Sequence, residues 1–235
     1  MTIQLEPIRR VVTYDDAQGR SRILADGPSP AVRVVQERPG YRVTNLWRTG
    51  ASPSSITAPD SITEHVGVSP PPQGTVLRII DIPPEPKDPQ ELQRAMEATF
   101  SNMYRDAHRE IKPGEHPGMH KTQTVDYALM LQGELVAIMD EEETVLRAGD
   151  VLIQRGTNHA WANRGKVRAR VAFVLIDAVP LGIGHAIGRH VKFVIPKMLS
   201  RNECKRGNSK NTHVFPVKYA VCISRHKFLR VRRAT

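Results

Sequence analysis

Two histidines and one carboxylate have the residue types and spacing of a site that could carry out chemistry: His120, Asp126 and His159. Side chains of a β-strand alternate between its faces with a period of two, so His120 and Asp126 are expected on one face of one strand. A second predicted strand and turn, after Gly149, carries His159. If the two strands meet, the three side chains converge. Two imidazoles and a carboxylate suit Fe(II) with open positions, or zinc with a water, so all three are predicted to be catalytic and metal-ligating.

Polar and aromatic residues near these three are predicted to line a substrate pocket. They are Thr122, Thr124, Gln154, Trp161 and Asn163. Trp161 either walls an apolar pocket or fills the interior of the protein, and the sequence leaves both open. It also leaves open a metal-free pocket, in which His120 and His159 act as hydrogen-bonding or acid–base groups.

The elements that must position these residues are mainly short strands. Runs rich in β-branched and aromatic residues, separated by turn formers, predict strands at residues 9–14, 22–24, 31–37, 41–47, 75–82, 125–131, 134–139, 143–146, 151–154 and 170–178. Residues 50–74 are rich in Pro, Ser, Gly and Thr and are interpreted as a long loop. The spacing around Gly133 predicts that residues 125–131 and 134–139 form a hairpin.

One helix is predicted, from Gln90 to about His108. Apolar residues recur there at spacings of three and four, which gives the apolar stripe of an amphipathic helix. Asp88 is a suitable N-cap residue, and Pro89 suits the first helical position.

Charge is unevenly distributed along the chain. The net charge is +10, from 34 basic and 24 acidic residues, yet residues 189–235 alone contain 13 Lys or Arg and one acidic residue. A basic segment can bind nucleic acid. This segment has no nucleic-acid-binding motif and no strand or helix periodicity, so we predict a poorly ordered extension and no nucleic-acid partner.

The remaining composition indicates one globular domain. A hydrophobic content of 40% and a charged content of 25% are ordinary for such proteins. The first ten residues lack the apolar core of a signal peptide, and residues 171–187 are interrupted by charged residues and proline, so no membrane association is predicted. The two cysteines form no metal or redox motif. A cytoplasmic location is therefore expected.

The segment from Gly114 to Gly133 resembles the first conserved motif of the cupin superfamily. That motif has a glycine, a His-x-His pair, a glutamate and a second glycine. Here His120 takes the position of the first histidine, Thr122 replaces the second, and Asp126 replaces the glutamate. Loss of the second histidine reduces the usual four cupin ligands to two histidines and one carboxylate.

The second cupin motif is matched by Gly149, His159 and Asn163, in a turn that is one residue shorter. The resemblance implies an all-β fold, a cupin or jelly-roll β-barrel with additional N-terminal strands and one external helix. Residues 1–110 are then N-terminal strands and a helix packed on the barrel, 111–178 the barrel core, and 179–235 the basic extension. Cupin barrels often pair through their sheets, so a homodimer is also expected.

Further strings at residues 38–40, 46–49 and 81–85 are similar to a group of small single-domain cupins from fungi and bacteria. Some fungal members accompany polyketide synthases in pathways to salicylaldehyde-type products. The resemblance implies a cupin-domain oxidoreductase or tailoring enzyme of secondary metabolism, which acts on a small aromatic or polyketide-derived substrate beside other pathway enzymes. The alternatives are a cupin dehydratase, cyclase or decarboxylase, and a non-catalytic cupin that binds small molecules.

Overall fold

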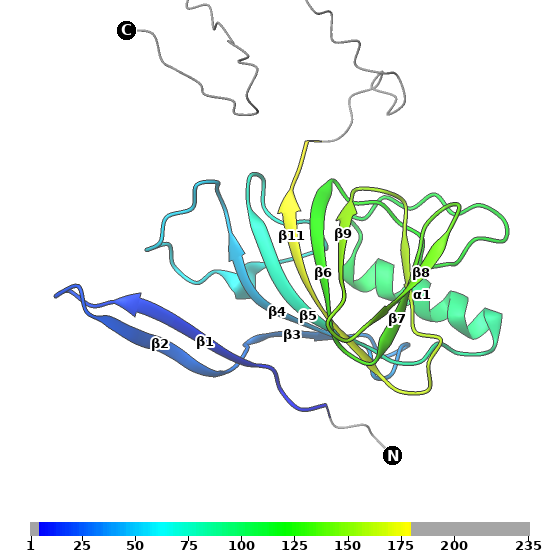
Figure 1. Cartoon of the computed structure of the whole chain (residues 1–235), viewed down its shortest axis with the longest axis horizontal. Helices are drawn as coiled ribbons and strands as arrows, with labels where there is room; N and C mark the ends of the chain where they lie inside the picture. The colour runs from blue at the N-terminus through cyan, green and yellow to red at the C-terminus, as the bar shows by residue number, and fades with distance from the viewer. Residues whose placement is uncertain (1–4, 180–235) are drawn as a thin grey trace, which may run out of the picture. The chain divides into compact units, whose positions relative to one another are not determined.

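The computed structural model describes residues 5–179. The predicted basic extension lies outside the described residues from position 180 onward. Within them, the prediction of an all-β fold with one helix is confirmed (Figure 1). The elements are β1 (Arg9–Asp15), β2 (Ser21–Pro28), β3 (Ala31–Val34), β4 (Arg42–Thr49), the 3-10 helix η1 (Ile62–Glu64), β5 (Thr75–Ile82), α1 (Pro89–Met103), β6 (Thr124–Gln132), β7 (Glu134–Ile138), β8 (Glu143–Arg147), β9 (Val151–Arg155), β10 (Ala160–Ala162) and β11 (Ala169–Asp177).

The strands form three antiparallel sheets. The largest has the order β3-β4-β5-β11-β6-β9, and the second has the order β10-β7-β8. The third is the β1–β2 hairpin, which contacts the largest sheet through a hydrogen bond from Arg10 to the carbonyl of Leu46. Side chains from the two larger sheets and from α1 form one hydrophobic core, which includes Val43, Val76, Phe100, Leu135 and Val171. The site is therefore positioned by strands from both larger sheets.

The predicted hairpin between residues 125–131 and 134–139 is wrong, because β6 and β7 belong to different sheets. Strand β6 is paired on one side with β11 and on the other with β9, so neither of its edges is available to β7. The chain crosses to the smaller sheet at Gly133, which has a φ of +75° and lies against the carbonyl of Arg168. A side chain at Gly133 would place its Cβ 2.9 Å from that oxygen, so the crossing requires glycine.

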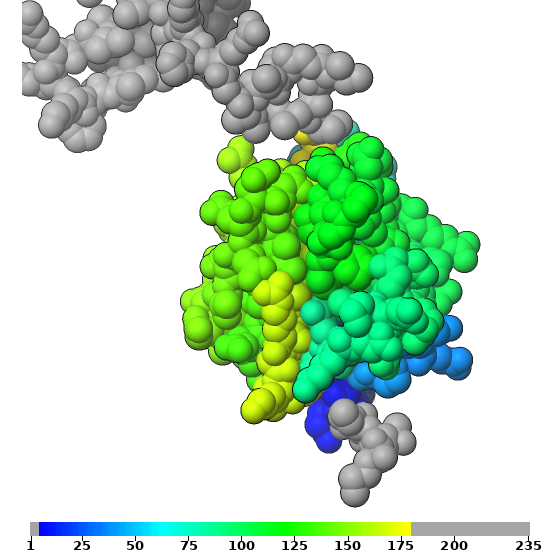
Figure 2. All heavy atoms as spheres, turned by 90° about the vertical axis from the view of Figure 1, so that its right-hand side faces the viewer, coloured from blue at the N-terminus to red at the C-terminus, as the bar shows by residue number. Residues whose placement is uncertain are grey.

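Helix α1 begins as predicted and ends earlier than predicted. The Asp88 side chain accepts a hydrogen bond from the backbone N–H of Gln90 at 2.8 Å. The predicted end near His108 is wrong, because Tyr104 leaves the helical conformation with φ −130° and ψ 47°. Its hydroxyl then lies 3.0 Å from the hydroxyl of Tyr41. The helix packs its apolar stripe on the sheets, and Figure 2 shows the green residues of α1 and the following segment beside the yellow-green smaller sheet.

No helix within residues 5–179 combines the length and the apolar character that a membrane crossing requires.

A buried charge cluster joins three strands of the largest sheet. Asp81 on β5 is fully buried and forms ion pairs with Arg42 of β4 at 2.8 Å and with Arg170 of β11 at 2.7 Å. Arg168, just before β11, pairs at 2.5 Å with Oδ1 of Asp81, the same oxygen that Arg170 contacts, while Arg42 contacts Oδ2. Breaking a buried ion pair by removing one partner is strongly destabilising, because the remaining charges are left without compensation. Asp81 therefore compensates three arginines at once.

Replacing Asp81 should destabilise the fold severely. We expect Asp81→Asn to lower the free energy of unfolding by about 3–5 kcal/mol, the range for removal of one partner of a buried pair, as measured by urea denaturation. The control is Asp26→Asn, which removes the partner of Arg9 on the exposed β1–β2 hairpin and should leave the midpoint almost unchanged. Similar shifts for the two variants would contradict the role given to Asp81.

Candidate functional site

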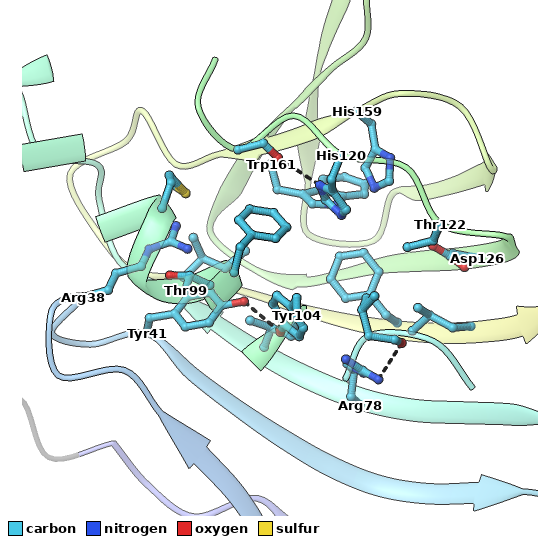
Figure 3. Close-up of a pocket in the computed structure, with 18 residues that line it drawn as sticks. Arg38, Tyr41, Arg78, Thr99, Tyr104, His120, Thr122, Asp126, His159 and Trp161 are labelled. Carbon is cyan, nitrogen blue, oxygen red and sulfur yellow. Dashed lines mark hydrogen bonds between the residues drawn. The ribbon is translucent and has the colours of Figure 1, made fainter. Parts of the chain in front are cut away.

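A cavity of about 70 Å³ lies among α1 and strands of both larger sheets (Figure 3). Because one enclosed water needs roughly 10–15 Å³ of such space, the cavity has room for several waters or part of a small ligand. Its apolar lining consists of Val68, Ile80, Ile82, Met96, Phe100, Trp161, Phe173 and Leu175. Its polar lining consists of Arg38, Tyr41, Arg78, Thr99, Tyr104, His120, Thr122, Asp126 and His159, with Gly118 completing the set. All three predicted catalytic residues therefore face this cavity.

The two histidines are brought together by their own backbones. The N–H of His120 donates to the carbonyl of His159 at 2.9 Å, and the N–H of His159 donates to the carbonyl of His120 at 3.0 Å. Their ring centroids lie 4.3 Å apart. The two segments thus meet as the sequence required, through an isolated bridge that precedes β6 and β10.

Each imidazole is held in one tautomer by a backbone carbonyl. Nδ1 of His120 lies 2.9 Å from the oxygen of Gly118, and Nδ1 of His159 lies 2.9 Å from the oxygen of Thr157. A carbonyl oxygen can only accept, so each Nδ1 carries the hydrogen and each Nε2 of the neutral ring keeps its lone pair.

Burial keeps both rings neutral at physiological pH. Desolvation lowers the pKa of His120 to about 4, and the nearby positive charge of Arg109 acts in the same direction. Desolvation lowers the pKa of His159 to about 3, with a further contribution from His120. The cavity therefore presents two unprotonated nitrogen acceptors next to each other.

An edge-to-face series of aromatic rings surrounds the histidines. Phe100 of α1 lies 5.1 Å from the ring of His120, and Trp161 of β10 lies 5.6 Å from the ring of His159. Trp161 in turn lies 5.2 Å from Phe173 of β11, so it both walls the cavity and packs in the core. These contacts fix the rings and exclude water from them.

Asp126 is the third of the predicted catalytic residues, and its carboxylate is incompletely hydrogen-bonded within residues 5–179. Its side chain is buried, and its Oδ1 has no hydrogen-bond partner within residues 5–179. Burial raises its pKa to about 6, although a hydrogen bond from Thr124 and the charge of Arg78 act in the opposite direction. Thr122, which also lines the cavity, bonds the hydroxyl of Thr124 at 2.7 Å.

The predicted three-ligand metal site does not fit this arrangement. Within residues 5–179, no three His, Cys, Asp or Glu side chains are grouped so as to hold a metal ion. Asp126 faces the cavity without joining His120 and His159 in such a group. The two histidines by themselves do have the features of metal ligands, namely a free Nε2 and an Nδ1–H fixed by a carbonyl.

Two of the other predicted pocket residues, Gln154 and Asn163, form hydrogen bonds with neighbouring segments of the chain. Gln154 accepts hydrogen bonds from the Thr157 hydroxyl at 2.5 Å and from the N–H of Arg155 at 3.0 Å, and it does not line the cavity. Asn163 donates to the carbonyls of Ile82 and Val167, which holds the segment after β10. Of the five predicted pocket residues, Thr122 and Trp161 reach the cavity.

Several lining residues were missed by the sequence analysis. Arg38, Tyr41, Arg78 and Tyr104 line the cavity but lie outside the two cupin motifs. His65, read from the sequence as a surface or loop residue, is instead buried, and its Nε2 accepts a hydrogen bond from Arg78 at 2.8 Å. Arg38 belongs to one of the strings that carry the cupin resemblance, Tyr41 and Arg78 lie in predicted strands, and Tyr104 lies in the predicted helix, but none of these signals indicates a role in a cavity.

Comparison with known proteins finds a matching family profile and relatives that cover most of this chain. Residues 107–176 match the family profile described as cupin domain. The Phomopsin biosynthesis cluster protein C' of Diaporthe leptostromiformis is 30% identical over 190 residues, which cover 77% of this chain and 84% of that protein. The cupin-domain-containing oxidoreductase fogC of Aspergillus ruber is 24% identical over 74% of each chain. Among solved structures, the cupin domain of Schizosaccharomyces pombe Cnp3 has a TM-score of 0.36 at 11% identity, covering 74% of this chain and 89% of that one.

The depressed histidine pKa values predict acid sensitivity. Below the ordinary histidine pKa of about 6.5, the unfolded chain binds protons that the folded protein does not, so stability is full above pH 6.5 and is lost as the pH falls toward 4. Asp126 acts oppositely, because its raised pKa gives stability below about pH 4 that is lost as the pH rises through 6.

The test compares His159→Gln with the unchanged protein in urea denaturation at about pH 7.5 and pH 5. His159 should account for roughly 2 kcal/mol of the stability lost between these values, so the variant should lose less. Asp126→Asn removes the opposing contribution and should lose more than the unchanged protein. Parallel pH profiles for all three proteins would show that the cavity does not control these pKa values.

Proposed function

We propose, since this chain belongs to the cupin family, that it is a tailoring enzyme of fungal secondary metabolism that modifies a small, largely apolar substrate in the cavity. The proposal is carried by one observation: His120, His159 and Asp126 face a single buried space whose other walls are mainly apolar and aromatic. Relatives that carry the words biosynthesis cluster and oxidoreductase in their names support the metabolic assignment. A polyketide-derived or aromatic compound matches the lining.

Substrate binding would depend on the aromatic walls. Phe100, Trp161 and Phe173 offer flat faces and edges that suit a planar ring or an unsaturated chain. Burial of the substrate between them would exclude water, which strengthens each polar interaction in the cavity. The apolar walls therefore supply affinity, and the few polar groups supply orientation.

Asp126 is the group best suited to proton transfer. Its pKa of about 6 is closer to neutrality than that of either histidine, so it exchanges protons at physiological pH. The free Nε2 atoms of His120 and His159 can accept hydrogen bonds from a substrate hydroxyl or enol and so orient it toward Asp126. This arrangement supports a dehydration, cyclisation or related reaction in which a proton is removed at one atom and returned at another.

A second candidate is a cupin oxidoreductase with a divalent metal. It is favoured by the fixed tautomers of His120 and His159, which leave both Nε2 atoms available as ligands. When bound, iron or zinc would supply Lewis-acid chemistry, and iron also electron transfer. Asp126 would remain outside the ligand set and keep its role with the substrate.

Catalysis is tested by disrupting the gene in the organism that encodes it and measuring small-molecule products by mass spectrometry. We expect the unchanged gene to restore the lost product and Asp126→Asn to lower its rate of formation by roughly 100-fold or more, the range for general acid–base groups. The control is Tyr127→Phe on the neighbouring residue, whose side chain is exposed and lies outside the cavity. If a folded Asp126→Asn protein restored the product fully, Asp126 would have no catalytic role.

The two candidates differ in metal content. If the second holds, the purified protein should retain close to one iron or zinc per chain by elemental analysis, and His159→Gln should lose it. Asp126→Asn should keep its metal, because Asp126 does not join the two histidines. Loss of metal from both variants would restore the three-ligand site. Full activity after chelator treatment would exclude the metal candidate.

A further inference from the structure

The end of the cavity formed by Arg38 contains a buried cation that forms no ion pair within residues 5–179. The Arg38 side chain lines the cavity and is only 8% exposed. Its guanidinium forms no hydrogen bond and no ion pair with any residue in the range 5–179. It lies over the face of the Tyr41 ring, 4.2 Å from the ring centroid, and this contact orients the plane of the guanidinium.

Burial of this charge is unfavourable without a partner. Desolvation lowers the pKa of Arg38, which shows that the surroundings disfavour the charged form. Glu85 acts on Arg38 only through space, and its carboxylate is bonded to His116 at 2.9 Å. Because arginine stays protonated in proteins, an incoming anion in direct contact would compensate this charge more fully than Glu85 does through space.

Two tyrosine hydroxyls add a donor at the same end of the cavity. The hydroxyls of Tyr41 and Tyr104 lie 3.0 Å apart, and both residues line the cavity. Only one O–H of such a pair donates to the other, so the second O–H remains available to a ligand. A planar guanidinium beside a phenolic O–H is a suitable pair of donors for a carboxylate.

Arg78, the other buried arginine of the cavity, is different. Its terminal nitrogens donate to Nε2 of His65 at 2.8 Å and to the carbonyl of Val68 at 2.9 Å. These neutral acceptors hold its side chain in the wall. Among the described residues Arg38 has no such bonds, so its guanidinium can bind a ligand.

We infer that Arg38 anchors a carboxylate of the substrate, so that the enzyme acts on an organic acid with an apolar, planar body. In Figure 3, Arg38 and Tyr41 lie at the opposite side of the labelled residues from Thr122 and Asp126. An acid held at Arg38 extends its body past Phe100 toward His120. That the far end of this acid reacts near His120 and Asp126 rests on the proposed function. Binding of the carboxylate by Arg38 is independent of it.

The experiment uses benzoate and benzamide as probes, because they share shape and differ in charge. Binding to the purified full chain is followed by calorimetry. We expect benzoate to bind at least tenfold more tightly than benzamide. Arg38→Gln should remove this preference and leave the affinity for benzamide unchanged. The control, Arg94→Gln, removes an exposed arginine of α1 that does not line the cavity and should retain the preference.

Equal affinities for the two probes in the unchanged protein would overturn the inference, as would a preference that survives in Arg38→Gln. Failure to bind benzoate at all would overturn it equally. Because binding is measured without turnover, charge-selective binding in a protein that makes no product refutes the proposed function and leaves the anchor standing. Equal binding in an active protein refutes the anchor alone.

Discussion

Exclusion of water from unpaired polar groups is the constraint on which the site depends. The fold buries the imidazole of His159, the carboxylate of Asp126 and the guanidinium of Arg38 around one small space, with His120 half-buried beside them, and it gives these groups few partners. Desolvation is the largest cause of every pKa shift among His120, His159, Asp126 and Arg38. Each shift disfavours the charged form. Burying these polar groups with few partners therefore costs free energy, and a ligand that pairs with them can reduce that cost.

Buried polar groups can be tolerated here because the surrounding sheet is fixed elsewhere. Asp81 ties β4, β5 and β11 together through three arginines, and these strands also carry the core side chains of the largest sheet. Around the cavity itself, the backbone bridge between His120 and His159 joins segments far apart in the chain. The site thus obtains its geometry from backbone hydrogen bonds and aromatic packing, while its polar side chains remain available.

The sequence predicted those cavity residues whose positions follow from local spacing. His120 and His159 were found because each belongs to a motif with glycines at fixed distances, and the fold class followed from the same motifs and the strand pattern. Arg38 and Arg78 were not assigned to the site. The place of Arg78 in the cavity depends on the pairing of β5 with β4 and β11, and Arg38 lies in the turn before β4, so local patterns determine neither position. The same limitation explains the incorrect β6–β7 hairpin: turn spacing suggested pairing, whereas competition from β9 and β11 decided it.

Thr122, which takes the place of a cupin histidine, changes the polar groups that line this cavity. Thr122 directs its hydroxyl to Thr124, so it offers the cavity a satisfied polar group instead of a third imidazole. Asp126 also lines the cavity, with an unpartnered oxygen within the described residues and a pKa that burial raises to about 6. The substitution thus does more than subtract a ligand. It leaves the histidine pair and the carboxyl group as chemically distinct groups. Under the proposed function, the histidine pair would orient the substrate and the carboxyl group of Asp126 would exchange a proton with it.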